Sequence, residues 1–213
     1  MNYIVFDMDG ILFDTERISH ESFKEIAAER GLPFEAQVLI DCIGKNRTDI
    51  LAHLCECYGE NFPAEEYLNL TVVRMHEKIE RDGLPIMKGA VDLLDGLKAG
   101  GWHIGLASSS GRKMIAAHLT RAGLDGYFEQ IIGGDMVEHS KPQPDIYVKA
   151  CELLGSKPEK TIAIEDSPNG IRAAYGAGMK PIMVPDMIKP TAEISAMLYR
   201  ECESLDEVRE MLL

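Results

Sequence analysis

Near its start the chain reads Tyr3-Ile4-Val5-Phe6-Asp7-Met8-Asp9-Gly10, an apolar run followed directly by two aspartates. If the run is a buried strand, both carboxylates emerge at its carboxyl end, where open α/β sheets place their ligands. Side chains two residues apart in extended backbone project to the same face, so one pocket could hold Asp7 and Asp9 together. A plain Asp-Gly turn explains the same residues. Taken alone, the stretch supports a turn and an active site equally.

The composition is that of a soluble globular protein. Of the 213 residues, 46% are hydrophobic and 27% are charged, and the length suits one core with a sizeable insertion. The net charge of -13 argues against nucleic acid or an anionic membrane as partner, because both require clustered Lys and Arg. An anionic substrate would therefore have to meet a local positive site.

The cysteines and the absence of long apolar segments bear on location. The five cysteines are odd in number and lack the paired spacing of zinc sites, which indicates free thiols. No export signal is recognisable, and no segment approaches the roughly 18 apolar residues of a membrane span. We expect a cytoplasmic protein, a monomer or weak homo-oligomer, that binds neither nucleic acid nor membrane.

Residues 16–82 carry the pattern of helices throughout. Apolar residues line one side of 16–30, and the spacing of three and four recurs over 47–58 and 64–81. Gly83-Leu84-Pro85 then breaks the pattern. The sequence therefore predicts an all-α segment here.

From about residue 86, helices and strands alternate, which is typical of parallel βαβ units. The first strand must join this sheet, because alone it could not satisfy its backbone hydrogen bonds. We predict an α/β fold with a Rossmann-like parallel sheet flanked by helices, formed by residues 1–15 and 83–213, and an inserted all-α helical bundle, residues 16–82. The expected elements are strands 102–107, 129–132, 161–165 and 180–184, helices 89–99, 111–122, 144–154 and 168–177, and further helical segments at the C-terminus.

Three more polar clusters follow strand-like runs. Ser108, Ser109 and Ser110 come after 102–107, and hydroxyls with backbone amides at such a strand end can hold phosphate oxygens. Ordinary helix capping is the alternative. Lys141 stands beside prolines that restrict the backbone, so its ammonium could be aimed at phosphate, although a lone surface lysine is the simpler explanation.

The last cluster is acidic. Glu165 and Asp166 follow the run 161–164, and adjacent acids leaving a buried strand are costly unless they are paired or bind a metal. Carboxylate oxygens suit magnesium. A capped turn with Pro168 at the first helical position is the alternative. Four polar clusters at four strand ends nevertheless make a coincidence of turn chemistry a poor explanation.

Together these clusters closely resemble the four sequence motifs of the haloacid dehalogenase superfamily. The matching residues are Asp7-x-Asp9-Gly10, Ser108, Lys141-Pro142 and Glu165-Asp166. The resemblance is closest to the phosphatase and β-phosphoglucomutase-like branch. It covers essentially the whole chain, because residues 16–82 lie where that family inserts its α-helical cap domain.

The resemblance implies a magnesium-dependent phosphatase that hydrolyses a small phosphorylated metabolite, with a sugar phosphate expected, through an aspartyl-phosphate. Asp7 would be the nucleophile that attacks phosphorus. Asp9 would protonate the leaving oxygen and then deprotonate water, while its backbone carbonyl helps to hold the metal.

The other motif residues would supply charge, hydrogen bonds and metal ligands. Lys141 and Mg²⁺ would oppose the negative charge that spreads over the phosphoryl oxygens. Ser108 and the amide of Ser109 would hold those oxygens. The implied metal ligands are Asp7, Asp9 and Asp166, with Glu165 close by.

Within the insertion, Ile43-Gly44-Lys45-Asn46-Arg47 resembles the family's substrate-specificity loop. Gly44 and Arg47 are its candidate substrate-binding residues, and Arg47 is most like the arginine that holds a distal phosphate in β-phosphoglucomutases. A solvated position in the next helix would explain Arg47 equally well. Residues that could also face the cleft, or lie on the surface, are Glu16, His20, Arg74 and His76.

β-Phosphoglucomutase is the main alternative, because the core motifs and Arg47 fit it. Those mutases have a histidine five residues after the aspartate equivalent to Asp14, where this chain has Ser19. His20 lies one place later and is rotated by about 100° around a helix. A mutase must also protect its aspartyl-phosphate from water, and the sequence shows no device for this. We therefore favour hydrolysis.

Other activities fit less well. The superfamily's dehalogenases lack the second acid, and its phosphonatases have a small residue there, so Asp9 counts against both. A non-catalytic phosphoacceptor or metal-binding regulatory module would also place acids, a hydroxyl and a lysine at parallel strand ends. Such modules are shorter and need no helical insertion.

Overall fold

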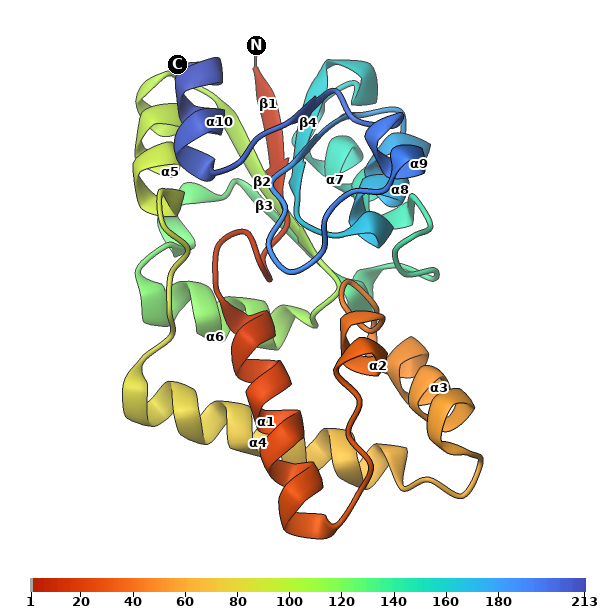
Figure 1. The fold of residues 1–213 in the computed structure, drawn as a ribbon. Helices are drawn as coiled ribbons and strands as arrows, with labels where there is room; N and C mark the ends of the chain where they lie inside the picture. The colour runs from red at the N-terminus through yellow and green to blue at the C-terminus, as the bar shows by residue number, and fades with distance from the viewer. Residues whose placement is uncertain (1) are drawn as a thin grey trace.

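The computed structural model describes residues 2–213, and within them six parallel strands form one sheet in the order β3-β2-β1-β4-β5-β6 (Figure 1). The predicted parallel α/β fold is therefore confirmed. This order reverses direction between β1 and β4, the crevice where open α/β sheets bind ligands. The strands are β1 (Tyr3–Phe6), β2 (His103–Ser108), β3 (Gln130–Gly133), β4 (Thr161–Glu165), β5 (Lys180–Met183) and β6 (Arg200–Glu201).

Helices cover both faces of the sheet. Ile4 and Phe6 of β1 are fully buried on one face, whereas Val5 is fully buried on the other. Strands buried on both faces read as continuous apolar runs, which is why β1 lacks alternation. The first face packs against α5 (Ala90–Ala99), α6 (Arg112–Ala122) and α10 (Leu205–Leu212), and the second against α7 (Asp145–Leu154) and α8 (Pro168–Gly176).

Strand register brings the polar clusters to one edge. Phe6 of β1 lies opposite Leu106 of β2 and Ile164 of β4. The Asp7 amide extends this pairing by donating to the Ile164 carbonyl at 2.9 Å. The residues that follow these three strands must therefore meet at the carboxyl edge of the sheet.

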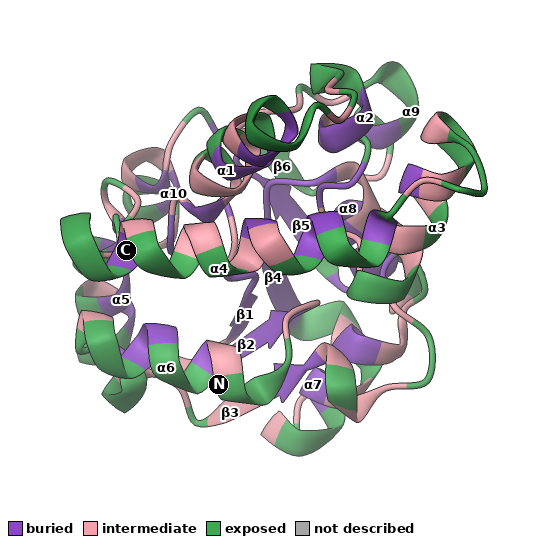
Figure 2. Ribbon diagram, turned by 90° about the horizontal axis from the view of Figure 1, so that it is seen from below, coloured by how far each residue is buried: buried purple, intermediate pink, exposed green. Residues whose placement is uncertain are grey.

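The helices between β1 and α5 lie beyond this carboxyl edge (Figure 1). They are α1 (Thr15–Arg30), α2 (Ala36–Ile40), α3 (Arg47–Tyr58) and α4 (Ala64–Asp82), and we call residues 15–82 the helical insertion. Phe23, Leu54 and Tyr67 belong to an apolar cluster within it, and the Tyr67 hydroxyl donates to the Phe23 carbonyl at 2.9 Å. Figure 2 shows α4 crossing in front of the buried strands.

The shortest helices and strands were not predicted from the sequence. β6 has only two residues, Arg200 and Glu201, both exposed and charged, and it exists through pairing with β5. The short helices α2 and α9 (Ala192–Ser195) were not separately predicted either. Among the helices of residues 2–213, none combines the length and apolar character needed to cross a bilayer.

Candidate active site

Lys141 is the centre of the polar edge. Its Nζ atom donates to Asp7 Oδ1 and Glu165 Oε1, both at 2.6 Å, and to the Ala107 carbonyl at 3.2 Å. The lysine is only 2% exposed and Glu165 is fully buried. Buried charges are costly unless they are paired and hydrogen-bonded, and here each of the ammonium's three donors has an acceptor. The β1 end, the β4 end and the loop before α7 are thereby tied together.

Glu165 is held from several directions. Besides Lys141, its Oε1 accepts from the Tyr147 hydroxyl at 2.6 Å, and its Oε2 accepts from the Ser167 hydroxyl at 3.2 Å. Burial, reinforced by the Glu165 charge, raises the pKa of Tyr147 well above its ordinary value, so the phenol stays protonated and donates. With its oxygens bonded in this way, Glu165 fixes the position of Lys141.

Three carboxylates crowd together at this edge. The ligating atoms of Asp7, Glu165 and Asp166 all lie within 4.8 Å of one another. Burial raises the pKa of Asp7 to about 8, although the Lys141 charge opposes this, and burial also raises the pKa of Asp166. In this buried setting the two carboxyls resist ionisation, and a further cation beside them would favour their charged forms. An oxygen-only donor set of carboxylates fits a hard divalent cation such as Mg²⁺.

Gly10 allows this crowding. Its φ of +79° is strained for any side chain, and a Cβ atom there would collide with the Asp166 carboxylate. Asp166 itself accepts no hydrogen bond within the part of the chain that the structure describes. Its oxygens are therefore available to a ligand.

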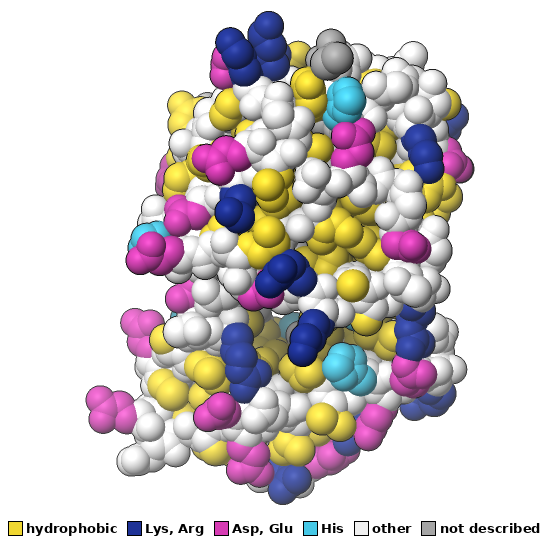
Figure 3. Space-filling view, turned by 180° about the vertical axis from the view of Figure 1, so that it is seen from behind, with side chains coloured by type: hydrophobic (Ala, Val, Ile, Leu, Met, Phe, Trp, Pro, Cys, Tyr) yellow, Lys and Arg dark blue, Asp and Glu magenta, His cyan; other side chains and the backbone are white. Residues whose placement is uncertain are grey.

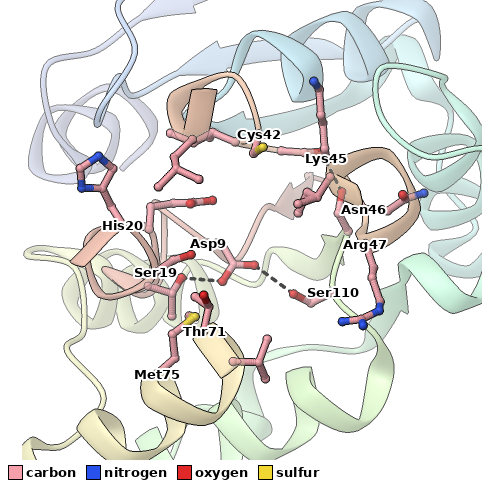
Figure 4. Close-up of a pocket in the computed structure, with 18 of the residues that line it drawn as sticks. Asp9, Ser19, His20, Cys42, Lys45, Asn46, Arg47, Thr71, Met75 and Ser110 are labelled. Carbon is pink, nitrogen blue, oxygen red and sulfur yellow. Dashed lines mark hydrogen bonds between the residues drawn. The ribbon is translucent and has the colours of Figure 1, made fainter. Parts of the chain in front are cut away.

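Asp9 faces away from the acidic cluster. Its Oδ1 accepts from the Thr15 hydroxyl at 2.5 Å, and its Oδ2 accepts from Ser108 and Ser110, each at 3.3 Å. Thr15 begins α1, so the helical insertion contributes directly to the position of Asp9. Figure 4 shows the Asp9 carboxylate bonded to Ser110 at the cavity wall. An acid/base group could work from this position without being a carboxylate ligand of the metal.

A cavity of about 390 Å³ lies between the carboxyl edge and the helical insertion. Asp7, Asp9, Lys141 and Asp166 line its floor, and residues of α1 to α4 line the rest. Figure 3 shows the surface hollowed at this junction. The size is at the small end of ligand pockets, which suits a small molecule.

The predicted specificity loop packs on the core. Asn169 donates to the Ile43 carbonyl at 3.3 Å, and the Ser109 hydroxyl donates to the Gly44 carbonyl at 3.1 Å. Gly44 has a φ of +77°, and a Cβ atom there would come within 2.8 Å of the Ser167 hydroxyl. The Ser109 side chain thus holds the loop, which leaves its amide as the group predicted to bind phosphate.

Arg47 lies in the cavity wall, but it is already engaged. Its Nη2 donates to Asn69 Oδ1 at 2.7 Å and lies 3.7 Å from Glu65 Oε1. The Arg47 side chain is 47% exposed. A substrate that used this guanidinium would have to compete with the amide and with solvent.

The remaining candidates of the insertion differ in position. Arg74 binds carboxylates of α1 and α4, and neither it nor His76 is a lining residue of the cavity. Glu16 and His20 do line the cavity, but the His20 ring packs edge-on against Phe34 and points away from Asp9 in Figure 4.

Sequence reasoning did not single out Tyr147, Asn169 or His118. Tyr147 lies on the buried face of α7, so periodicity identifies it only as core. His118 of α6 lines the cavity, and its buried Nδ1 has no hydrogen-bond partner among the described residues. Their contacts join distant parts of the chain, and no local pattern could have indicated them.

This chain is similar in sequence and in structure to several known proteins. Residues 4–184 match the sequence profile of the haloacid dehalogenase-like hydrolases. YhcW of Bacillus subtilis is 35% identical, covering 99% of this chain and 94% of its own. The "Phosphorylated carbohydrates phosphatase" of Thermotoga maritima is 31% identical over 85% of this chain and 84% of its own. The crystal structure of CbbY from Rhodobacter sphaeroides in complex with phosphate superposes with a TM-score of 0.81 at 27% identity, covering 98% of this chain and 96% of that one.

Proposed function

This chain belongs to the haloacid dehalogenase-like hydrolase family as a phosphoric monoester hydrolase, and we propose that it hydrolyses small phosphorylated metabolites in two steps through an aspartyl-phosphate on Asp7. The observation that carries the proposal is the bond between Lys141 and Asp7 on the cavity floor. It holds one oxygen of the carboxylate in place. The other oxygen, Oδ2, accepts no hydrogen bond from residues 2–213, which leaves it as the attacking atom.

In the first step Asp7 Oδ2 forms a bond to phosphorus as the ester oxygen leaves. Asp9 gives that oxygen a proton, so the alcohol departs neutral. In the second step Asp9 takes a proton from water, the water oxygen attacks phosphorus, and the Asp7 carboxylate is released with inorganic phosphate. The Asp9 bonds to Thr15, Ser108 and Ser110 hold it for both transfers.

Groups at the carboxyl edge of the sheet would also stabilise the negative charge of the phosphoryl group. Asp7 and Asp166, with Glu165 beside them, would hold Mg²⁺, and the Asp9 carbonyl is the fourth group expected from the resemblance. When bound, the ion supplies positive charge that offsets both the acidic cluster and the phosphoryl group. Lys141 supplies a further fixed charge, and the Ser109 amide would hold a phosphoryl oxygen, whereas the single hydroxyl proton of Ser108 is donated to Asp9.

The test is release of inorganic phosphate from a set of small phosphomonoesters, with Mg²⁺ and with excess chelator. Activity should require Mg²⁺, and Asp7→Asn should reduce kcat by at least about a thousandfold because the nucleophile is lost. Asp9→Asn should accumulate a phosphoenzyme from 4-nitrophenyl phosphate, whose leaving group needs no proton. Unchanged turnover in either variant would contradict the assigned roles.

Product identity separates hydrolysis from the mutase alternative. With β-glucose 1-phosphate, a phosphatase releases free phosphate and a mutase yields glucose 6-phosphate. Ser19 in place of the mutase histidine, and the engagement of Arg47 by Asn69, both favour hydrolysis. The cytoplasmic location and the monomeric or weakly oligomeric state stay predictions from sequence.

A further inference from the structure

His118 of α6 is a buried residue whose ring forms no hydrogen bond. The residue is 6% exposed, and its Nδ1 is the one buried side-chain nitrogen or oxygen without a hydrogen-bond partner among residues 2–213. An unpaired buried polar atom lowers the stability of the fold. Proteins retain such atoms mainly where they serve binding or catalysis. His118 is therefore a candidate for a role in the cavity that it lines.

The other ring nitrogen of His118, Nε2, reaches the cavity. Neither nitrogen forms a hydrogen bond within the described chain, yet only Nδ1 is closed off from solvent, so Nε2 belongs to the small exposed part of the ring. The ring is held on the core side by the fully buried Phe13, which it meets edge-on with a distance of 5.8 Å between ring centroids. Nε2 is thus a fixed, unpaired hydrogen-bonding atom at the cavity surface.

Helix α6 sets the distance between His118 and the reacting groups. Gly111, Met114 and His118 all line the cavity, and their spacing of three and four residues places them on one side of the helix. Ser110, which donates to Asp9, directly precedes them. At 1.5 Å per residue, His118 lies about 10 Å farther along the axis than Gly111. The phosphate would bind near the beginning of α6, and His118 is placed to meet the leaving group.

The His118 ring suits an uncharged oxygen better than a second anionic group. Burial lowers the pKa of His118 below its ordinary 6.5, although the Asp9 charge opposes the shift, so the imidazole is neutral at pH 7 and offers an anion no positive charge. A nitrogen of a neutral imidazole either donates or accepts, depending on the tautomer, whereas a hydroxyl group can do both. A substrate hydroxyl therefore matches Nε2 in either tautomer.

Unpaired polar side chains also line the cavity from the helical insertion. The side chains of Glu16, Ser19 and Lys45 form no hydrogen bond within residues 2–213. These three residues are half-buried, so solvent can reach them, whereas the ring of His118 is almost wholly enclosed by the protein. A hydroxylated leaving group would find hydrogen-bonding groups on both walls, and His118 gains the most from its arrival.

We propose that His118 is a specificity-determining residue of the phosphatase, and that its Nε2 atom forms a hydrogen bond with a hydroxyl group of the substrate's leaving group. This inference rests on the proposed function and adds to it one residue and one feature of the substrate. In a closed cavity the substrate hydroxyl loses its water, and the bond to Nε2 replaces that contact. A leaving group without a hydroxyl leaves Nε2 unpaired and gains no such bond.

The test compares a hydroxylated phosphomonoester with phenyl phosphate, whose ring carries no hydroxyl group. The hydroxylated ester is whichever of glucose 6-phosphate, fructose 1-phosphate and glycerol 3-phosphate the wild type hydrolyses with the highest kcat/KM. His118→Leu should lower the ratio of kcat/KM for this ester to kcat/KM for phenyl phosphate by about tenfold or more, because the substrate hydroxyl is left without a partner. An unchanged ratio would overturn the inference.

Two further variants separate the hydrogen bond from the shape of the ring. His118→Gln places an amide near the position of Nε2, where it can donate or accept, and should keep the ratio within about threefold of the wild type. Thr120→Leu, on the exposed side of the same helix, should leave the ratio unchanged. Folding of His118→Leu is not at risk, because the substitution removes an unpartnered nitrogen and breaks no hydrogen bond. Equal losses in the Leu and Gln variants would contradict a hydrogen bond to the substrate.

The activities of the wild type separate this inference from the proposed function. If the protein hydrolyses phenyl phosphate and none of the three hydroxylated esters, it is a phosphatase without the inferred specificity, so the inference fails and the proposed function stands. If it hydrolyses no phosphomonoester at all, the proposed function fails and the inference falls with it.

Discussion

Two lysines in this molecule each contact two carboxylates, in very different surroundings. Lys141 at the carboxyl edge lies 2.6 Å from both Asp7 and Glu165, whose side chains are 10% and 0% exposed. Lys78 of α4 lies 3.2 Å from Glu21 and 2.8 Å from Glu25, whose side chains are 68% and 44% exposed. The inter-atomic contacts are alike, but the carboxylates around Lys141 are almost entirely buried, whereas those around Lys78 are largely exposed.

Because of this difference in exposure, the two lysine clusters contribute differently to folding. Water and salt screen the exposed acids around Lys78, so that cluster contributes little to folding. In the buried cluster, removal of one partner leaves a charge without compensation. The carboxyl edge therefore depends on complete pairing, whereas the helical insertion is stabilised mainly by its apolar cluster.

The largest expected effect is that of Lys141→Met. It leaves Asp7 and Glu165 facing each other without a cation, and we expect a loss of about 3–5 kcal/mol in the free energy of unfolding. Urea denaturation without Mg²⁺ measures it, with Lys149→Met, which removes a lysine of α7 that forms no ion pair in the described chain, as control. A loss no greater than that of the control would remove the basis of the comparison.

Tyr147→Phe should have the next largest effect. It removes the buried hydroxyl that donates to Glu165 and keeps the ring, so we expect a loss of about 2 kcal/mol in unfolding free energy, typical of a hydrogen bond to a charged group. The control is Tyr175→Phe, because Tyr175 is 54% exposed. If both variants unfold alike, the Tyr147 bond contributes nothing to the buried cluster.

His118→Leu tests the lining of the cavity, where the carboxyl edge of the sheet meets the helical insertion. Because Nδ1 of this buried ring has no partner in the described residues, an apolar replacement should stabilise the fold by about 1 kcal/mol at pH 7. Burial lowers the pKa of His118 below its ordinary 6.5, with Asp9 opposing the shift. Below pH 6.5 the unfolded imidazole therefore takes up a proton more readily than the folded one, and wild-type stability falls.

The stability difference between His118→Leu and the wild type should accordingly grow as pH falls from 7 towards 5. It should stay constant above pH 7, where the imidazole is neutral in both states. Thermal or urea unfolding at several pH values measures it. A difference that shrinks on acidification would mean that His118 gains a stabilising partner when protonated.

The smallest effect is expected from Lys78→Met. The substitution is the same as at Lys141, but its carboxylate partners are exposed, so the loss should stay under about 1 kcal/mol. Raising NaCl to 0.5 M should remove most of it, because salt screens exposed pairs. A loss as large as that of Lys141→Met would show that exposure does not distinguish the two clusters.

The sheet was predictable because its signals are local. Continuous apolar runs indicated strands buried on both faces, and the runs before Asp7, Ser108 and Glu165 became β1, β2 and β4. The helical pattern of the insertion was predicted from periodicity in the same way. Missed elements such as β6 are short and polar, and they exist only because a neighbouring strand supplies hydrogen bonds.

The candidate site also contains both residues that the sequence identified and residues that it did not. Positions at strand ends identified Asp7, Ser108 and Asp166, and the prolines beside it singled out Lys141 in the loop after β3; the structure brings the four to one edge, while their catalytic roles stay predictions. Tyr147 and Asn169 could not be found in this way. Each contacts a residue far along the chain, and its own neighbours in sequence suggest only a buried or a capping role.

The sequence by itself determined which residues reach the carboxyl edge, because strand ends follow from apolar runs and parallel register. Only the tertiary structure decided which groups pair there and what faces them. Lys141 donates to Asp7 and Glu165, and Arg47 donates to Asn69. The physical reason is that strand formation depends on neighbouring residues, whereas the free energy of a charge or a hydroxyl depends on burial and on partners that the chain brings from a distance.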